Sequence, residues 1–288
     1  MMNSFIDIFW LTIKGSFNWF VRSIVFDVPW YLNYFWGLIV ISFVVWGLEL
    51  LFPWRKTQAV FRKDFWLDSF YMFFNFFLFS ISVSGLYALF VQLFYSLGGT
   101  ISLLAIIPVK QLPVVAQLLV FFVLLDFVQW ATHIALHKFP LFWNFHKIHH
   151  SVKEMGFAAH LRYHWMENIL YKPLKTIAVL LLGGFEPEQA YIVHFVAIII
   201  GHLNHANLKL TYGPFKYVFN NPVMHLYHHA YELPKGKFGV NFGISLSLWD
   251  YLFKTNYVPE DSGAILLGFP KDEMVPKTFW KQLISGFR

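Results

Sequence analysis

The 288-residue sequence contains no cysteine and is poor in charged residues. The lack of cysteine excludes disulfides, thiolate metal sites, iron–sulfur clusters and haem held by a thiolate. Charged residues make up 13% of the chain, whereas a soluble domain usually carries about a quarter. Hydrophobic residues make up 57% and aromatic residues 21%. This composition is typical of an integral membrane protein whose aromatic side chains face lipid and anchor its interfaces.

The charge that is present is mainly basic, and the net charge is +6 at pH 7. Lysines and arginines flank the apolar stretches, which fits anionic lipid headgroups. The sequence contains no nucleic-acid-binding motif. We therefore expect the lipid bilayer as a partner and no nucleic acid.

Histidine is missing from both ends of the chain, because all thirteen histidines lie between His133 and His229. Residues at i, i+3 and i+4 share one face of a helix, and neutral imidazole is a ligand for iron, zinc and copper. Eight imidazoles exceed the needs of one ion and suit two ions with about four or five ligands each, so they predict a dinuclear metal site. They form one HxxxH and two HxxHH boxes: His133 and His137; His146, His149 and His150; His225, His228 and His229.

Three apolar segments, residues 34–52, 65–97 and 114–136, are long enough to cross a bilayer. The loop between the first two is basic, which places it in the cytoplasm by the positive-inside rule. A connector with Pro108 and Pro113 then lies on the far side. This route brings every histidine-rich segment to the cytoplasmic face. The basic residues of the loop are Arg55, Lys56, Arg62 and Lys63.

Two shorter apolar segments, residues 174–182 and 188–200, are separated by a Gly–Gly pair and Pro187. The first is too short to cross, so the pair predicts a re-entrant helical hairpin. We predict an all-α integral membrane protein with about three full transmembrane helices, this hairpin and a cytoplasmic histidine-rich helical cap. We expect a multi-pass location in a bacterial inner membrane or the endoplasmic reticulum.

No repeat or linker divides the chain, so we expect one structural domain with three parts. Residues 1–112 hold an N-terminal interfacial helix and membrane spans, because the first 28 residues are aromatic but interrupted by charges. Residues 113–257 form the histidine-box catalytic region. Residues 258–288 form a C-terminal tail.

The order of the three boxes resembles that of the fatty acid hydroxylase/sterol desaturase superfamily of membrane di-iron oxygenases. Four other segments, which read LRYHWME, HAN, NFG and WDYLFKT and start at Leu161, His205, Asn241 and Trp249, resemble further elements of that superfamily. The resemblance covers roughly residues 120–256. Three residues depart from its usual pattern: Ile134 replaces Arg, Trp165 replaces Pro and Lys254 replaces Gly.

The resemblance implies an all-helical membrane enzyme that binds two iron ions and uses O2 to hydroxylate or desaturate a C–H bond of a lipid. Such a reaction needs two electrons from outside. The sequence has no flavin, NAD or haem motif, so a separate electron donor of the reductase, ferredoxin or cytochrome b5 type is expected.

The candidate site residues extend beyond the eight box histidines. The HAN element adds His205 as a ligand, and His202 lies on the same helix face. His164 is a further candidate, either as a ligand or as support. Around the ligands we expect the carboxylates and one guanidinium of Asp126, Arg162, Glu167 and Asp250 to support the metal site. We expect a supporting role for His160 and a structural role for His194.

Two other classes of function fit the sequence less well than an oxygenase. A histidine-lined metal transporter would place polar residues midway along its spans, whereas these boxes gather at one membrane face. A non-catalytic metal-binding membrane protein with structural zinc would normally use cysteine. Hydroxylation, desaturation and ether cleavage share the same site, and the substrate lipid stays open. For a lipid substrate we predict an apolar pocket between the spans, with aromatic walls such as Phe73, Phe77, Phe122 and Trp130.

Overall fold

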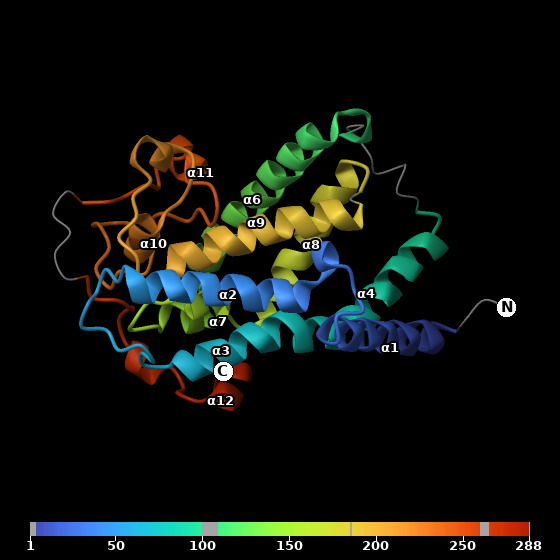
Figure 1. Ribbon diagram of the computed structural model, residues 1–288, viewed down its shortest axis with the longest axis horizontal. Coiled ribbons are helices and arrows are strands. Elements are labelled where there is room, and N and C mark those ends of the chain that lie inside the picture. The colour runs from blue at the N-terminus through green and yellow to red at the C-terminus, as the bar shows by residue number, and fades with distance from the viewer. Residues whose placement is uncertain (1–3, 100–108, 185, 260–264, 288) are drawn as a thin grey trace.

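The regular elements of the chain are helices, joined by loops with isolated β-bridges, in the computed structural model (Figure 1), which describes residues 4–99, 109–184, 186–259 and 265–287. The N-terminal elements are α1 (Phe5–Ile24), η1 (Trp30–Leu32), α2 (Tyr34–Leu51), α3 (Phe65–Phe73), the π-helical turn η2 (Phe74–Leu78) and α4 (Phe79–Ser96). The middle elements are η3 (Val109–Gln111), α6 (Val114–Lys138), α7 (Pro140–His150), η4 (Phe157–Leu161), α8 (Trp165–Leu181) and α9 (Pro187–His205). The last are η5 (Gly213–Tyr217), α10 (Pro222–His228), α11 (Leu248–Leu252), η6 (Asp272–Met274) and α12 (Phe279–Leu283).

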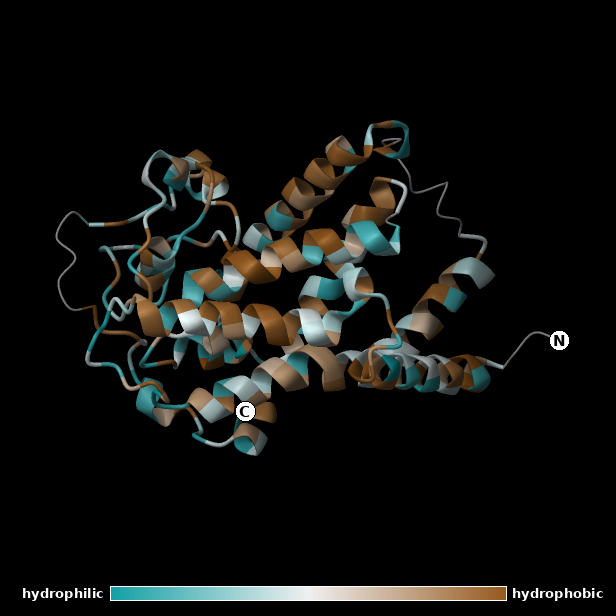
Figure 2. Cartoon of the chain, in the orientation of Figure 1, coloured by the Kyte–Doolittle hydropathy of each residue, from teal (hydrophilic) through white to brown (hydrophobic). Residues whose placement is uncertain are grey.

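Three helices among the described residues are long and apolar enough to cross a membrane: Tyr34–Leu51, Phe65–Ser96 and Val114–Lys138. They match the three predicted spans. Large apolar side chains such as Phe43, Phe90 and Leu119 are exposed on their outer surfaces. Such extended apolar surface is unfavourable in water and is covered in a bilayer. Figure 2 shows the apolar residues concentrated on the long helices and more polar residues in the loops around α10 and α11. The all-helical fold class is confirmed.

The segment predicted as a hairpin consists of α8 and α9, which are longer than the sequence suggested. Gly183 and Gly184 join them with φ values of 91° and 87°, the left-handed conformation that glycine adopts without steric cost. Pro187 starts α9 at a position where proline's missing N–H is not needed. The depth of this pair in the membrane stays a prediction, and Pro108 of the predicted far-side connector lies outside the described residues.

The N-terminal helix α1 packs along α4. Gly85 of α4 allows this close approach, because a Cβ there would lie 2.6 Å from the ring of Phe9. Ser4 and Asp7 form a capping box that satisfies the backbone N–H groups at the start of α1. Phe5 and Trp10 of α1 stay exposed, as expected for a helix in contact with lipid.

A side chain near the end of α2 connects two segments that border the histidine-rich region. Glu49 is buried, and its Oε1 accepts hydrogen bonds from the backbone N–H groups of Phe157 (2.7 Å) and Asn207 (2.9 Å). One carboxylate therefore joins α2 to η4 and to the end of α9. The histidine-bearing elements gather at the same end of the bundle, on the left in Figure 1.

The predicted topology can be tested with single cysteines, since the native chain has none. Val60 and Leu97 are exposed and lie beyond opposite ends of the Phe65–Ser96 helix. In intact cells an impermeant thiol reagent should label Leu97→Cys, whereas Val60→Cys should react only after permeabilisation. Labelling of Val60→Cys from outside would overturn the cytoplasmic placement of the cap.

Candidate metal centre

Nine histidines from four segments form two adjoining groups. The segments are the last turns of α6, the length of α7, the end of α9, and α10 with its C-cap. Within each group, one nitrogen from every histidine lies within 4.8 Å of the others. The rings of His150 and His229, which belong to different groups, stack with centroids 4.3 Å apart. Group 1 is His133, His137, His146, His150 and His228, and group 2 is His149, His205, His225 and His229.

Each HxxHH box contributes to both groups. In α7, the i and i+4 residues His146 and His150 belong to group 1, and His149 belongs to group 2. In α10 the assignment is reversed, because His228 belongs to group 1 while the other two histidines of that box belong to group 2. The two helices therefore link the groups, and neither group can form from one box alone.

Hydrogen bonds to the backbone fix the position of the proton on two of the four histidines of group 2. His149 Nδ1 lies 3.0 Å from the carbonyl oxygen of Arg162, and His205 Nδ1 lies 2.7 Å from that of Gly201. A carbonyl can only accept, so each Nδ1 must carry the proton and each Nε2 must present a lone pair. These two Nε2 atoms are 3.3 Å apart. Two facing lone pairs repel each other unless a cation lies between them.

Group 1 shows the same orientation of rings by carbonyls. His133 Nδ1 and His228 Nδ1 donate to the carbonyl oxygens of Phe242 and Val240, both at 2.7 Å. Their Nε2 atoms are therefore acceptors. The Nε2 atoms of His137, His150 and His228 are buried and make no hydrogen bond with the described residues. Buried polar atoms normally have a partner, and bound metal ions would supply it here.

Burial also sets the charge of these imidazoles. It lowers the pKa of His149 to about 3 and holds the pKa values of His146, His150 and His228 well below the usual range. The rings are therefore neutral at pH 7, as a metal ligand must be. A set of nine neutral nitrogens fits iron, zinc or copper and does not fit hard cations such as calcium or magnesium.

Two of the predicted supporting residues contact histidines of the groups, Glu167 through its side chain and Arg162 through its backbone. Glu167 contacts a ligand directly, since its Oε2 lies 3.0 Å from His146 Nδ1. Burial raises the pKa of Glu167 well above its usual range. Arg162 orients His149 through its backbone carbonyl, while its guanidinium binds Asp64, Asp68 and Ser151.

Asp126 and Asp250 bind a loop instead of the histidines for which we expected them. Asp126 accepts hydrogen bonds from the backbone N–H groups of Ser245 and Leu246 and from the indole of Trp249. Asp250 accepts from the N–H groups of residues 242 and 243, from the indole of residue 130 and from the hydroxyl of residue 255. The same loop supplies the carbonyls that orient two group 1 histidines. The effect of both carboxylates on the ligands is therefore indirect.

Two further histidines proposed as ligands lie outside both groups. His164 caps α8: its Nδ1 accepts from Met166 N–H, and its Nε2 donates to the carbonyl oxygen of Leu283. His202 uses Nδ1 with His160 (2.8 Å) and Nε2 with the Ser42 hydroxyl (3.2 Å). Both nitrogens of each ring are thus engaged elsewhere.

The remaining two histidines, His160 and His194, also lie outside both groups. His160 borders group 2, where its ring lies against the backbone of Gly201 and would collide with any Cβ at that position. His194 belongs to neither group and stacks on Phe76.

Two cavities border the spans, with volumes of about 210 and 370 Å³. Trp46, Glu49 and Phe65 are among the residues that line the smaller, and Phe77 is among those that line the larger. Neither is lined by a histidine of the two groups. Trp130, which we expected in a pocket wall, lines neither cavity, and its indole donates a hydrogen bond to Asp250. An apolar channel that reaches the metals stays a prediction.

Comparison with known proteins identifies this region. The family model "Fatty acid hydroxylase" matches residues 118–255, which include every histidine of both groups. Residues 118–255 are a fatty acid hydroxylase domain. The predicted relationship to the fatty acid hydroxylase/sterol desaturase superfamily is confirmed.

Curated relatives of this fatty acid hydroxylase domain act on lipids or long-chain aldehydes by name. The chain is 30% identical over 177 residues to the ornithine lipid hydroxylase OlsE of Rhizobium tropici, which is 62% of this chain and 52% of that protein. It is 24% identical over 140 residues to the very-long-chain aldehyde decarbonylase GL1-7 of Oryza sativa subsp. japonica and 26% identical over 142 residues to CER1 of Arabidopsis thaliana. The match spans about half of the first relative and 21% of each of the others. No solved structure matches significantly. These similarities support an enzyme with a lipid oxygenase-type activity.

Two departures of this fatty acid hydroxylase domain from the superfamily pattern have structural consequences. Lys254 has φ 57°, a left-handed conformation that explains why glycine is usual there. Trp165 is the first residue of α8, a position that favours proline, and its indole donates instead to the Leu283 carbonyl (2.8 Å). Neither residue belongs to the histidine groups.

Loss of one ligand should remove metal without preventing membrane insertion. We expect His149→Ala and His228→Ala each to lower metal affinity by more than the roughly 10–100-fold that is typical of an outer-shell change. His194→Ala is the matched control and should retain the metal content of the wild type. Elemental analysis of purified protein measures this. A metal-free His194→Ala protein beside a fully loaded His149→Ala protein would refute the assignment.

Metal removal should also destabilise the fold, because it leaves the lone pairs of His149 and His205 facing each other. A free metal concentration 1,000 times the dissociation constant stabilises a protein by about 4 kcal/mol. Chelator-treated protein should therefore unfold at a lower temperature in detergent and recover on addition of ferrous iron. An unchanged unfolding temperature after complete removal would argue against a metal-dependent fold.

Proposed function

We propose that this protein is a membrane-bound di-iron oxygenase that hydroxylates, or desaturates, a C–H bond of a lipid with O2 and external electrons. The single observation that carries the proposal is the pair of Nε2 lone pairs of His149 and His205, held 3.3 Å apart in a buried site. The adjoining group with five imidazoles supports a second ion. The choice of iron over zinc or copper rests on the family, because the nitrogen ligands suit all three.

Two bound iron ions would supply the activation of O2. The chain supplies the surroundings in which such chemistry is selective. Eight of the nine histidines of the two groups are nearly inaccessible to water, and burial of this kind protects a reactive oxidant from side reactions. Both groups consist of neutral rings alone, so ligand carboxylates do not offset the metal charge. Glu167, held against His146 Nδ1, is placed to orient that ligand through a hydrogen bond.

The substrate that we propose is a membrane lipid. Support comes from the position of the histidine groups at one end of three apolar helices, and from relatives named as an ornithine lipid hydroxylase and aldehyde decarbonylases. We propose that the cap faces the cytoplasm, where a separate electron donor of the reductase, ferredoxin or cytochrome b5 type can reach it. Ornithine lipids and other amino-acid lipids are the first class to test.

Lipid analysis of cells that express the wild-type protein or His149→Ala tests the activity. Hydroxylation should add one oxygen atom to a lipid species in the wild-type sample, and desaturation should remove two hydrogen atoms. Growth under ¹⁸O2 should label the hydroxyl oxygen, because an oxygenase takes it from O2 and a hydrolase takes it from water. Anaerobically purified active protein should contain about two iron ions per chain. Active protein without metal, or a product labelled only from water, would exclude a di-iron oxygenase.

A further inference from the structure

The backbone of Leu161–Tyr163 lies between the metal centre and the second membrane span. The carbonyl of Arg162 accepts the Nδ1 proton of His149 and so directs Nε2 of that ring into group 2. The neighbouring carbonyls of Leu161 and Tyr163 point the other way and accept hydrogen bonds from the span. The position of one metal ligand therefore depends on how the span holds these three residues.

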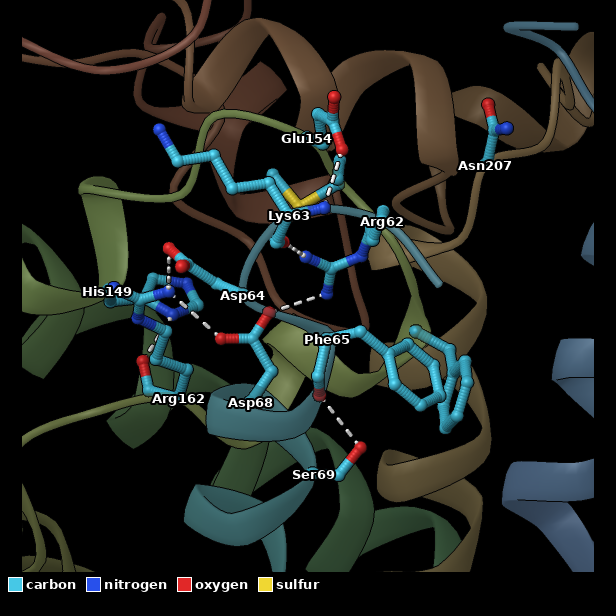
Figure 3. Close-up of polar contacts among 12 residues, drawn as sticks. Arg62, Lys63, Asp64, Phe65, Asp68, Ser69, His149, Glu154, Arg162 and Asn207 are labelled. Carbon is cyan, nitrogen blue, oxygen red and sulfur yellow. Dashed lines mark hydrogen bonds and ion pairs between the residues drawn. The ribbon is translucent and has the colours of Figure 1, made fainter. Parts of the chain in front are cut away.

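The first contact is made through the side chain of Arg162, as Figure 3 shows. Its guanidinium binds Asp68 of α3 and Asp64, each at 3.0 Å, and Ser151 at 3.1 Å. Asp68 is fully buried and also binds Arg62. One carboxylate is thus shared by two guanidinium groups, and the network is well shielded from solvent.

The second contact comes from Asn75, two helical turns further along the same helix. Its amide nitrogen donates to the carbonyl oxygens of Leu161 (3.0 Å) and Tyr163 (2.8 Å), and the side chain is buried. Asn75 lies in the π-helical turn η2, and such turns interrupt regular helices frequently at functional sites. Both donor protons of one amide are therefore used on the residues that flank Arg162.

We propose that Asp68 and Asn75 are positioning residues that set the orientation of His149, so that the span Phe65–Ser96 is part of the metal site. This inference rests on the proposed metal centre and adds residues that lie outside both histidine groups. The span holds Leu161, Arg162 and Tyr163 from one side, through the Arg162 side chain and the carbonyls of the two neighbours. The Arg162 carbonyl is not bound by the span and faces His149. Apolar packing of α3 against η4 alone would not specify that direction.

Three variants separate positioning from packing. Asn75→Leu keeps the branching of the side chain at Cγ and removes both donors, Asn75→Ala leaves space, and Asp68→Asn removes the charge between the two arginines. Ser84→Ala is the matched control in the same span, because the Ser84 hydroxyl donates to the carbonyl of Ile81 in its own helix and has no hydrogen bond to the histidine region among the described residues. Each purified protein is titrated with ferrous iron, and with Co²⁺, whose visible absorption reports the ligand geometry of each ion.

We expect the wild type and Ser84→Ala to bind two ions, and the three variants to bind one ion normally. The second ion should bind about 10–100-fold more weakly, as for other changes to groups that orient a ligand. Two normal ions with an unchanged Co²⁺ spectrum in Asn75→Leu and Asp68→Asn would overturn the inference while leaving the metal centre in place. If all three variants fail to insert or lose both ions together, the residues serve folding and the inference is also overturned. A wild type that binds no metal would instead refute the proposed function.

Discussion

The interaction on which the rest of this structure depends is the hydrogen bond between an imidazole Nδ1–H and a backbone carbonyl. Four histidines of the two groups make it, with the carbonyls of Arg162, Gly201, Val240 and Phe242 as acceptors. Each bond fixes the position of one proton and turns the opposite lone pair toward the centre of a group. A centre into which such lone pairs point is stabilised when it holds cations. The backbone segments that carry the four carbonyls are therefore as important to the candidate metal site as the histidines.

A buried carboxylate from each of the three long apolar helices holds one of these segments or the residues beside it. Glu49 of α2 binds the N–H groups of Phe157 and Asn207. Asp68 of the second span binds Arg162, and Asp126 of α6 binds the loop at Ser245. A charge in an apolar helix is costly and is retained where it has partners and a function. Here the partners are the backbone and guanidinium groups of the cap, so the spans and the cap form one unit.

This arrangement also explains why polar residues within the spans do not indicate a transport path. Transporters place such residues around a route through the membrane. Asp68 and Asp126 are instead nearly inaccessible and bind protein groups. Their contacts serve the histidine groups at one end of the bundle, which agrees with the proposed enzyme and not with a transport path.

The sequence by itself determined the helical character, the three long apolar helices and the identity of the box histidines. Those features are local: apolar length specifies a span, and i, i+3, i+4 spacing places imidazoles on one helix face. Spacing also indicated that eight imidazoles suit two ions. It could not show that each HxxHH box divides between the groups, because the division depends on where α7 and α10 pass between the two centres.

Only the tertiary structure decided which groups support the ligands. His164 and His202 have the right chemistry for metal ligands, but helix capping and a contact with α2 occupy their nitrogens. Asp126 and Asp250 act through a loop more than a hundred residues from Asp126 in sequence. Asp68 and Asn75 carry no sequence signal, since a single polar residue in an apolar helix does not reveal its partner. Long-range hydrogen bonds depend on how distant segments meet, and that follows from packing of the whole chain.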